Sequence, residues 1–372
     1  MKITPRHIIW AVVAGLILAP AFWFFAPYNI AASKKHLPGV GGLLHGYMQN
    51  AVGIRAYSLD IPTHIDLSDP GLIRLGAGHF ATGCATCHGA PGLPRNPLVE
   101  GMQPAPPRLD DSGYTAKEFY WLARHGLKYT GMPAWAGEGR DDEPWALAAF
   151  LAQYDQIDPE TYRELAFGTA SIPEGAAVSF GNLTGGLDAE ANCARCHGED
   201  GLGRDGTAPK LAGQDVAYLE YALGEYAAGR RESGFMEPVA ASLSKAQISA
   251  LAQDFAAMNG AWDGQPSPVG GDIGRGRELA QRGDEHEEVP SCVSCHGDAQ
   301  TSPSKPGIPA IAGQDARWLI TWLHMWRDGP VPKGTQAQVM QRAVAGLTDE
   351  DIRALAAFYA VQSTEAPEPD AD

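Results

Sequence analysis

The chain has 372 residues, of which 44% are hydrophobic and 19% are charged, so it can form about two to four folded domains and is too apolar for a disordered protein. Its formal net charge of -16 argues against nucleic acid as a partner, because phosphate binding needs a basic surface. An acidic surface of this kind would instead steer a basic protein partner toward it.

The first element expected along the chain is a membrane-spanning helix. Residues 8–27 form a run of twenty residues without a charge, which is the length that a bilayer span requires. A small-x-small tripeptide inside this run would also suit a signal-peptide cleavage site. We favour an uncleaved anchor at 1–29, because the apolar run continues through four aromatic residues at 22–25. Residues 30–69 would then form a connector.

Six cysteines form three pairs, and a histidine follows each pair directly. The three copies of this Cys-x-x-Cys-His motif are Cys84, Cys87 and His88; Cys193, Cys196 and His197; and Cys292, Cys295 and His296. A closed zinc site takes four ligands from two such pairs, and three pairs do not divide in that way. A thioredoxin-like redox pair needs neither the histidine nor three copies. Covalent attachment of haem c uses every residue of the motif, so the sequence predicts three covalently bound haem c groups.

The residues after each motif repeat a pattern. The second and third copies both continue with Pro-x-[Leu/Ile]-Ala-Gly-Gln-Asp, followed by an apolar helical stretch that ends at glycine. Each unit then closes with an apolar-periodic helix, at 143–154, 244–258 and 348–362. Two of these helices begin with capping boxes, formed by Ser244 with Gln247 and by Thr348 with Asp351. Alternating strand patterns are nearly absent, so the sequence predicts an all-α protein.

This arrangement resembles the class I cytochrome c fold, in which a Cys-x-x-Cys-His motif precedes a Pro-x-Leu element, a methionine and a closing helix. The second and third units resemble tandem dihaem class I cytochromes, and the first resembles single-domain bacterial cytochromes with a Gly-Met-Pro-Ala-Trp loop. The resemblance implies three tandem domains after the anchor, at 70–155, 175–260 and 271–362. Residues 155–182 and 260–271 are interpreted as linkers, and 363–372 as a disordered acidic tail. Glycines before the second motif predict that the first helix of that unit is short or lost.

The resemblance also implies the remaining ligands. In the family a methionine between the Pro-x-Leu element and the closing helix supplies the second axial ligand of the iron. The matching methionines here follow their motif histidines by 44, 39 and 44 residues, and are Met132, Met236 and Met340. In the family a proline carbonyl holds the other ring nitrogen of the ligand histidine. The prolines at the matching positions are Pro107, Pro209 and Pro309.

Haems with both axial positions filled leave no open site for a substrate, so we expect an electron carrier and not an enzyme. Covalent haem attachment is expected outside the bacterial cytoplasm, which places the haem domains in the periplasm and the anchor in the inner membrane. The expected donors are a quinol-oxidising complex or a periplasmic dehydrogenase, and the expected acceptor is a terminal oxidase.

Two alternatives remain open. One is an electron-accepting cytochrome subunit of a dehydrogenase, and the other is a haem enzyme, such as a peroxidase or a thiosulfate-oxidising cytochrome, with one exchangeable ligand.

Overall fold

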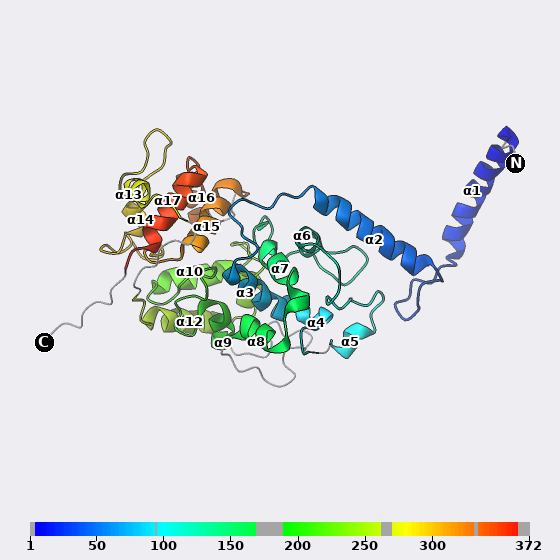
Figure 1. Cartoon of the computed structure of the whole chain (residues 1–372), viewed down its shortest axis with the longest axis horizontal. Helices are drawn as coiled ribbons and strands as arrows, with labels where there is room; N and C mark the ends of the chain where they lie inside the picture. The colour runs from blue at the N-terminus through cyan, green and yellow to red at the C-terminus, as the bar shows by residue number, and fades with distance from the viewer. Residues whose placement is uncertain (1–3, 94, 169–188, 262–269, 331–333, 364–372) are drawn as a thin grey trace.

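An isolated apolar helix leads into the folded part of the protein. In the computed structural model α1 (Pro5–Phe25) projects away from the other elements, and none of its side chains is buried (Figure 1). It is long and apolar enough to cross a membrane, and Pro20 lies within it. The next helix, α2 (Val40–Tyr57), packs on the first helical unit through the buried side chains of Val52 and Ala56.

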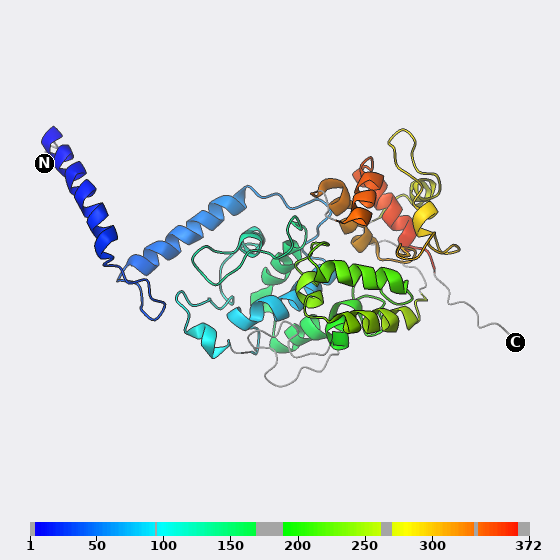
Figure 2. The ribbon, with the colours of Figure 1, turned by 180° about the vertical axis from the view of Figure 1, so that it is seen from behind.

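The structure describes residues 4–93, 95–168, 189–261, 270–330 and 334–363, and within these ranges it contains helices and two isolated β-bridges but no strand. The first unit consists of α3 (Pro70–His79), α4 (Ala85–His88), α5 (Pro97–Glu100), α6 (Ala116–His125), α7 (Pro144–Leu151) and α8 (Pro159–Phe167). The second consists of α9 (Ala189–His197), α10 (Val216–Ala227), α11 (Met236–Ala240) and α12 (Lys245–Ala257). The third consists of α13 (Ile273–Arg282), α14 (Val293–His296), α15 (Ala316–Asp328), α16 (Thr335–Val344) and α17 (Asp349–Ala360). The predicted all-α class is confirmed, and Figure 2 shows the same units from behind.

The first and third units share the same helix crossing. Helix α3 packs on α7 in the first unit, and α13 packs on α17 in the third. In both crossings a glycine meets a backbone carbonyl. A Cβ atom added at Gly76 would lie 2.0 Å from the oxygen of Ala146, and one added at Gly276 would lie 2.0 Å from the oxygen of Ala354. The repeat seen in the sequence is therefore also a repeat of backbone packing, in which glycine lets two helices touch.

The second unit has a smaller buried core than its neighbours. The buried residues of its core cluster come from α10 and α12, and include Leu219, Leu251 and Phe255. The predicted short or missing first helix of this unit falls on residues 169–188, which lie outside the described residues.

Helix boundaries follow the local sequence closely. The hydroxyl of Ser244 accepts a hydrogen bond from the Gln247 amide at the start of α12, and the Gln247 side chain binds the Ser244 amide in return. Thr348 and Asp351 make the same exchange at the start of α17. Both predicted capping boxes are thus confirmed, because a hydroxyl and a side-chain oxygen at this spacing satisfy two backbone donors that the helix leaves open.

The interpretation of 155–182 as a linker was wrong over its first part. Asp158 caps α8 by accepting hydrogen bonds from two backbone amides, and Pro159 occupies the first helical position. The helix packs on α3 and buries Tyr162 and Phe167 in the core of the first unit. The remainder, 169–182, lies outside the described residues.

The connector touches the third unit before it enters the first. The ring of His64 stacks on that of His324 in α15, with centroids 4.1 Å apart and planes 10° from parallel. Asp69, the N-cap of α3, accepts two hydrogen bonds from Arg317 of α15 at 2.9 and 3.1 Å. The start of the first unit and α15 of the third therefore lie against each other.

Candidate functional site

The three motif histidines lie at equivalent places. Each is the last residue of its helix, in α4, α9 and α14. Helix α9 carries both cysteines of its motif, and α4 and α14 carry the second cysteine only. The Nδ1 atom of His88 lies 2.8 Å from the carbonyl oxygen of Pro107. The corresponding distances are 2.8 Å for His197 and Pro209, and 2.9 Å for His296 and Pro309. In each unit the carbonyl oxygen accepts from the Nδ1 N–H and leaves Nε2 as the nitrogen able to bind a metal.

Burial keeps these three imidazoles neutral. It lowers the pKa of His88, His197 and His296, and the proline carbonyl, which favours the protonated ring, opposes the shift only in part. A neutral imidazole is the form that ligates iron. Burial also raises the pKa of the Cys84 thiol to about 12 and that of Cys292 to about 11. Such thiols stay protonated at neutral pH, unlike the low-pKa cysteines of redox catalysts.

The third unit brings all its predicted site residues to one cavity. The cavity measures about 910 Å³, and its lining includes Cys292, Cys295, His296, Pro309 and Met340. The Nε2 atom of His296 and the Sδ atom of Met340 face each other at 3.5 Å. Volumes up to about 1,000 Å³ are typical of cofactor pockets.

An aromatic ladder from α15 forms another wall of this cavity. Trp318, Trp322 and Trp326 follow one another at four-residue spacing, with ring centroids 6.0 and 5.2 Å apart, and all three line the cavity. Arginines from the other two units stack on the middle ring. The guanidinium of Arg140 lies 4.8 Å from the centroid of Trp322, and that of Arg231 lies 4.5 Å from it. The cavity of the third unit is thus completed by both of its neighbours.

The residues present fit haem c. A flat, largely apolar group needs an apolar cavity, and covalent attachment needs two thiols beside an imidazole whose Nε2 is available. The third unit supplies these features together, with a thioether facing the imidazole. A zinc site would need at least three His, Cys, Asp or Glu side chains gathered around one point. Among the described residues no such group is found.

In the first unit Met132 lies in a loop that is fastened at both ends. Its amide donates to the Thr130 hydroxyl at 3.1 Å, and its carbonyl oxygen accepts from the Leu127 amide at 3.2 Å. The end of the Met102 side chain packs against the same loop, since a Cβ atom added at Gly131 would lie 2.5 Å from its terminal methyl carbon. Met132 is half-buried.

In the second unit Met236 is the first residue of the short helix α11. Its amide donates to the hydroxyl of Ser233 at 3.0 Å. This loop contacts the first unit through the buried carboxylate of Glu143, a residue that the sequence pattern marks only as the start of a helix. The contacts of Glu143 lie between units, so the sequence cannot reveal them directly. The local signal is the run of charged residues Arg140-Asp141-Asp142-Glu143 directly before an apolar helix.

Taken together, the fold and the site define an all-α protein whose repeated helical units each present a Cys-x-x-Cys-His motif, as c-type cytochromes do. Comparison with known families agrees. Residues 71–151 match the family model for cytochrome c oxidase, cbb3-type, subunit III, and residues 187–253 and 274–360 match that for cytochrome c. The chain belongs to the class I c-type cytochromes, and it is an electron-transfer protein with covalently bound haem c.

The chain is similar to several characterised proteins. It is 34% identical to the thiosulfate dehydrogenase electron acceptor of Stutzerimonas stutzeri (strain A1501), over 45% of this chain and 77% of that protein. It is 32% identical to the protein of the same name from Thiomonas intermedia (strain K12), over 46% of this chain and 79% of that one. It is 28% identical to cytochrome c4 of Pseudomonas aeruginosa, over 50% of this chain and 90% of that one. These alignments span about half of this chain.

Proposed function

We propose that this chain is a triheme electron carrier in which each haem iron is closed by one histidine and one methionine. The axial pairs are His88 and Met132, His197 and Met236, and His296 and Met340. One observation carries the proposal: the His296 Nε2 and the Met340 Sδ face each other within a cavity that both thiols of the motif also line. A haem iron held by these two residues would have no vacant position for a substrate, so single-electron transfer is the chemistry that the site would supply.

The proposal places the haem units in the periplasm, held to the inner membrane by α1. Support comes from the length and apolar composition of α1 and from its full exposure outside the folded units. An anchored carrier meets membrane-bound redox complexes at a high effective concentration.

The donor in this proposal is a thiosulfate dehydrogenase and the acceptor is a terminal oxidase. The donor is supported by the two relatives named as electron acceptors of thiosulfate dehydrogenase, each matched over more than three quarters of its length. The acceptor is supported by the match of residues 71–151 to the oxidase subunit III model. With a net charge of -16, the chain should dock on basic surfaces in a salt-sensitive manner.

The test uses the full-length protein extracted from membranes. Mass spectrometry should find three haems on each chain, and optical and magnetic spectra should show only low-spin, six-coordinate iron. Thiosulfate together with its dehydrogenase should reduce the protein, at a rate that falls as salt is added. Fewer than three haems, or ready binding of carbon monoxide to the unmodified ferrous protein, would contradict the proposal and favour a haem enzyme with an exchangeable ligand.

A further inference from the structure

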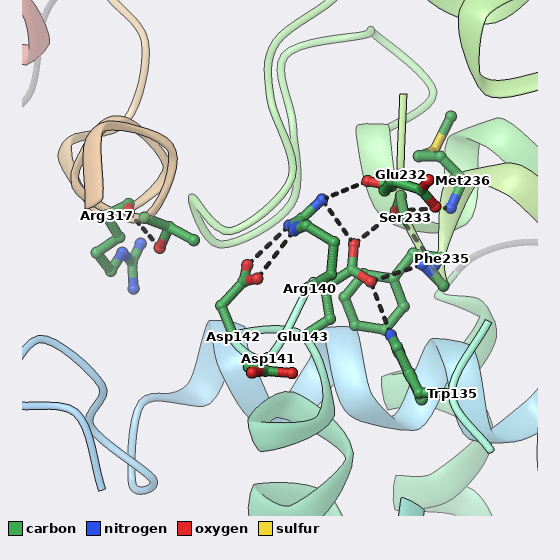
Figure 3. A network of polar contacts seen from close by, with 12 residues as sticks. Trp135, Arg140, Asp141, Asp142, Glu143, Glu232, Ser233, Phe235, Met236 and Arg317 are labelled. Carbon is green, nitrogen blue, oxygen red and sulfur yellow. Dashed lines mark hydrogen bonds and ion pairs between the residues drawn. The ribbon is translucent and has the colours of Figure 1, made fainter. Parts of the chain in front are cut away.

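A buried carboxylate of the first unit accepts hydrogen bonds from the second. Glu143 precedes α7, and only 4% of its surface is exposed. One carboxylate oxygen accepts from the hydroxyl of Ser233 at 2.5 Å, and the other accepts from the amide of Gly234 at 2.6 Å. The second oxygen also accepts from the indole N–H of Trp135 at 2.9 Å. Figure 3 shows these contacts converging on one side chain.

The groups that Glu143 holds belong to two loops, one with Met132 and Trp135 in the first unit and one with Ser233 and Met236 in the second. These two loops are called the methionine segments. The Ser233 hydroxyl also accepts hydrogen bonds from the amides of Phe235 and Met236, at 3.2 and 3.0 Å. It therefore caps the turn that presents Met236, while its own proton goes to Glu143. On the other side Trp135 lies three residues after the methionine of the first unit.

The two segments are in close contact beyond these hydrogen bonds. The rings of Trp135 and Phe235 meet edge to face, with centroids 5.4 Å apart. A Cβ atom added at Gly234 would lie 2.3 Å from the Trp135 ring, and one added at Gly137 would lie 2.6 Å from the Gly234 amide nitrogen. Glycine is required at both places, because Gly234 lies against the Trp135 ring and Gly137 lies against the backbone of Gly234. A small movement of one segment must move the other.

The negative charge of Glu143 is balanced inside the junction. A guanidinium nitrogen of Arg140 lies 3.0 Å from the carboxylate, and the same guanidinium binds both oxygens of Asp142 at 2.8 and 2.7 Å. Arg140 also donates to the carbonyl of Glu232 at 3.1 Å, next to Ser233. A buried ion pair is costly unless its hydrogen bonds are satisfied, and truncating one partner of a satisfied pair disrupts its surroundings. Replacing Glu143 should therefore be felt in both segments.

We propose that Glu143 is a positioning residue that holds the methionine segments of the first and second units together, so that thioether ligation in the second unit depends on a carboxylate of the first. This inference rests on the proposed function, in which Met132 and Met236 are iron ligands. It adds that the two methionine segments move together, because Glu143 binds Trp135 of one segment and Ser233 of the other.

The test compares four variants of the full-length holoprotein. Glu143→Ala removes every contact of the carboxylate. Glu143→Gln keeps an acceptor oxygen for the Gly234 and Trp135 N–H groups and serves as the conservative rescue. Ser233→Ala leaves the carboxylate and Arg140 in place and removes the hydroxyl, which donates to Glu143 and accepts from the Phe235 and Met236 amides. Asp69→Asn is the matched control: it breaks an ion pair between the first and third units, keeps the helix cap, and touches no methionine segment.

Two measurements decide the outcome. The first is the rate at which carbon monoxide displaces the thioether from each ferrous haem, with haems assigned through Met132→Ala and Met236→Ala. The second is hydrogen exchange at the Gly234 and Met236 amides, which does not depend on electron-transfer activity. For Glu143→Ala we expect the carbon monoxide rate to rise about tenfold or more in the first and second units, with the third unit unchanged, and exchange at the Gly234 and Met236 amides to rise by a similar factor. Ser233→Ala should affect the second unit alone, and Glu143→Gln should lie closer to the wild type.

The inference is overturned if Glu143→Ala and Ser233→Ala both match Asp69→Asn in exchange and in carbon monoxide binding. Such a result would leave the proposed function intact, since the wild type would still contain closed haems. Conversely, a wild type that already binds carbon monoxide at the first or second haem contradicts the proposed function. Hydrogen exchange at residues 233–236 then decides alone whether Glu143 holds the segment. If Glu143→Ala does not fold, Ser233→Ala carries the same decision for the second unit.

Discussion

Gln214 and Gln314 each bind the backbone of the other's unit. The buried side-chain amide of Gln214 accepts from the Ala310 N–H at 2.8 Å and donates to the Ala310 carbonyl at 3.0 Å. Gln314 does the same with Lys210, at 3.0 and 2.9 Å. Each contacted residue directly follows the proline whose carbonyl holds a motif histidine, so the reciprocal exchange ties the two histidine supports to each other.

This exchange predicts the effect of removing it. Gln214→Leu should remove the side-chain partner of the N–H and carbonyl of the half-buried Ala310 and destabilise the contact between the second and third units by about 1–3 kcal/mol. Gln314→Leu should do the same at Lys210. Hydrogen exchange at those two amides measures the loss. Gln253→Leu, at an exposed position on α12, is the control and should change stability by less than about 0.5 kcal/mol. Equal effects of all three substitutions would contradict the assignment.

The helix crossings predict that replacing their contact glycines with alanine, which adds a single methyl group, destabilises the fold. Gly76→Ala places a methyl group where the Ala146 carbonyl lies, so α3 and α7 must move apart at a cost of about 1–3 kcal/mol or more. Gly276→Ala should have the same effect in the third unit. Gly46→Ala in α2 meets no atom within 4 Å and should instead stabilise its helix by about 0.5–1 kcal/mol. Urea unfolding of the three variants measures the difference, and a neutral Gly76→Ala would refute the packing described.

The stack of His64 on His324 predicts a pH dependence of stability. Burial, and then the neighbouring His324, lower the pKa of His64 to about 4, although Asp142, Asp349 and Asp328 oppose the shift. The unfolded chain therefore binds the proton first as the pH falls below about 6.5, and stability is lost between that value and about 4. After a discount for the partial exposure of His64, we expect a loss of about 1 kcal/mol between pH 7 and pH 5.

The variant that tests this pH dependence is His64→Phe, which keeps a stacked ring and removes the titration. Its urea unfolding free energy should change less between pH 7 and pH 5 than that of the wild type. If the unfolding free energy of His64→Phe changes between pH 7 and pH 5 as much as that of the wild type, other groups cause the pH dependence.

Substituting Met340 should open one haem and leave the others closed. In Met340→Ala the cavity of the third unit keeps both cysteines and His296 but loses the sulfur that faces the Nε2 atom. We expect carbon monoxide to bind one haem of the three and the potential of that haem to fall, because thioether ligation raises it. Met325→Ala, which removes another methionine lining the same cavity, should leave all haems six-coordinate. The opposite pattern would make Met325 the ligand.

How far the sequence could predict this molecule depends on the range of the interactions involved. The capping boxes at Ser244 and Thr348 are settled by residues three positions apart, so the sequence predicts them directly. At the start of α8 the local sequence is ambiguous: proline is typical of linkers, but Pro159 at the first helical position after the N-cap Asp158 is also a helix start signal. Glu143 could not be assigned from the sequence, because its partners Ser233 and Gly234 lie in another unit and no local pattern links them.

The ion pair between Asp69 and Arg317 joins residues 248 positions apart in the chain. The third unit therefore folds back onto the segment that precedes α3, where it contacts both Asp69 and His64. A polypeptide shortened from its carboxyl end before residue 270 would leave Asp69 and His64 without these contacts, even if its remaining units were intact. Dissection of the molecule is better begun from the amino-terminal side, by cutting between α1 and α2, because such a cut leaves the contacts of Asp69 with Arg317 and of His64 with His324 in place.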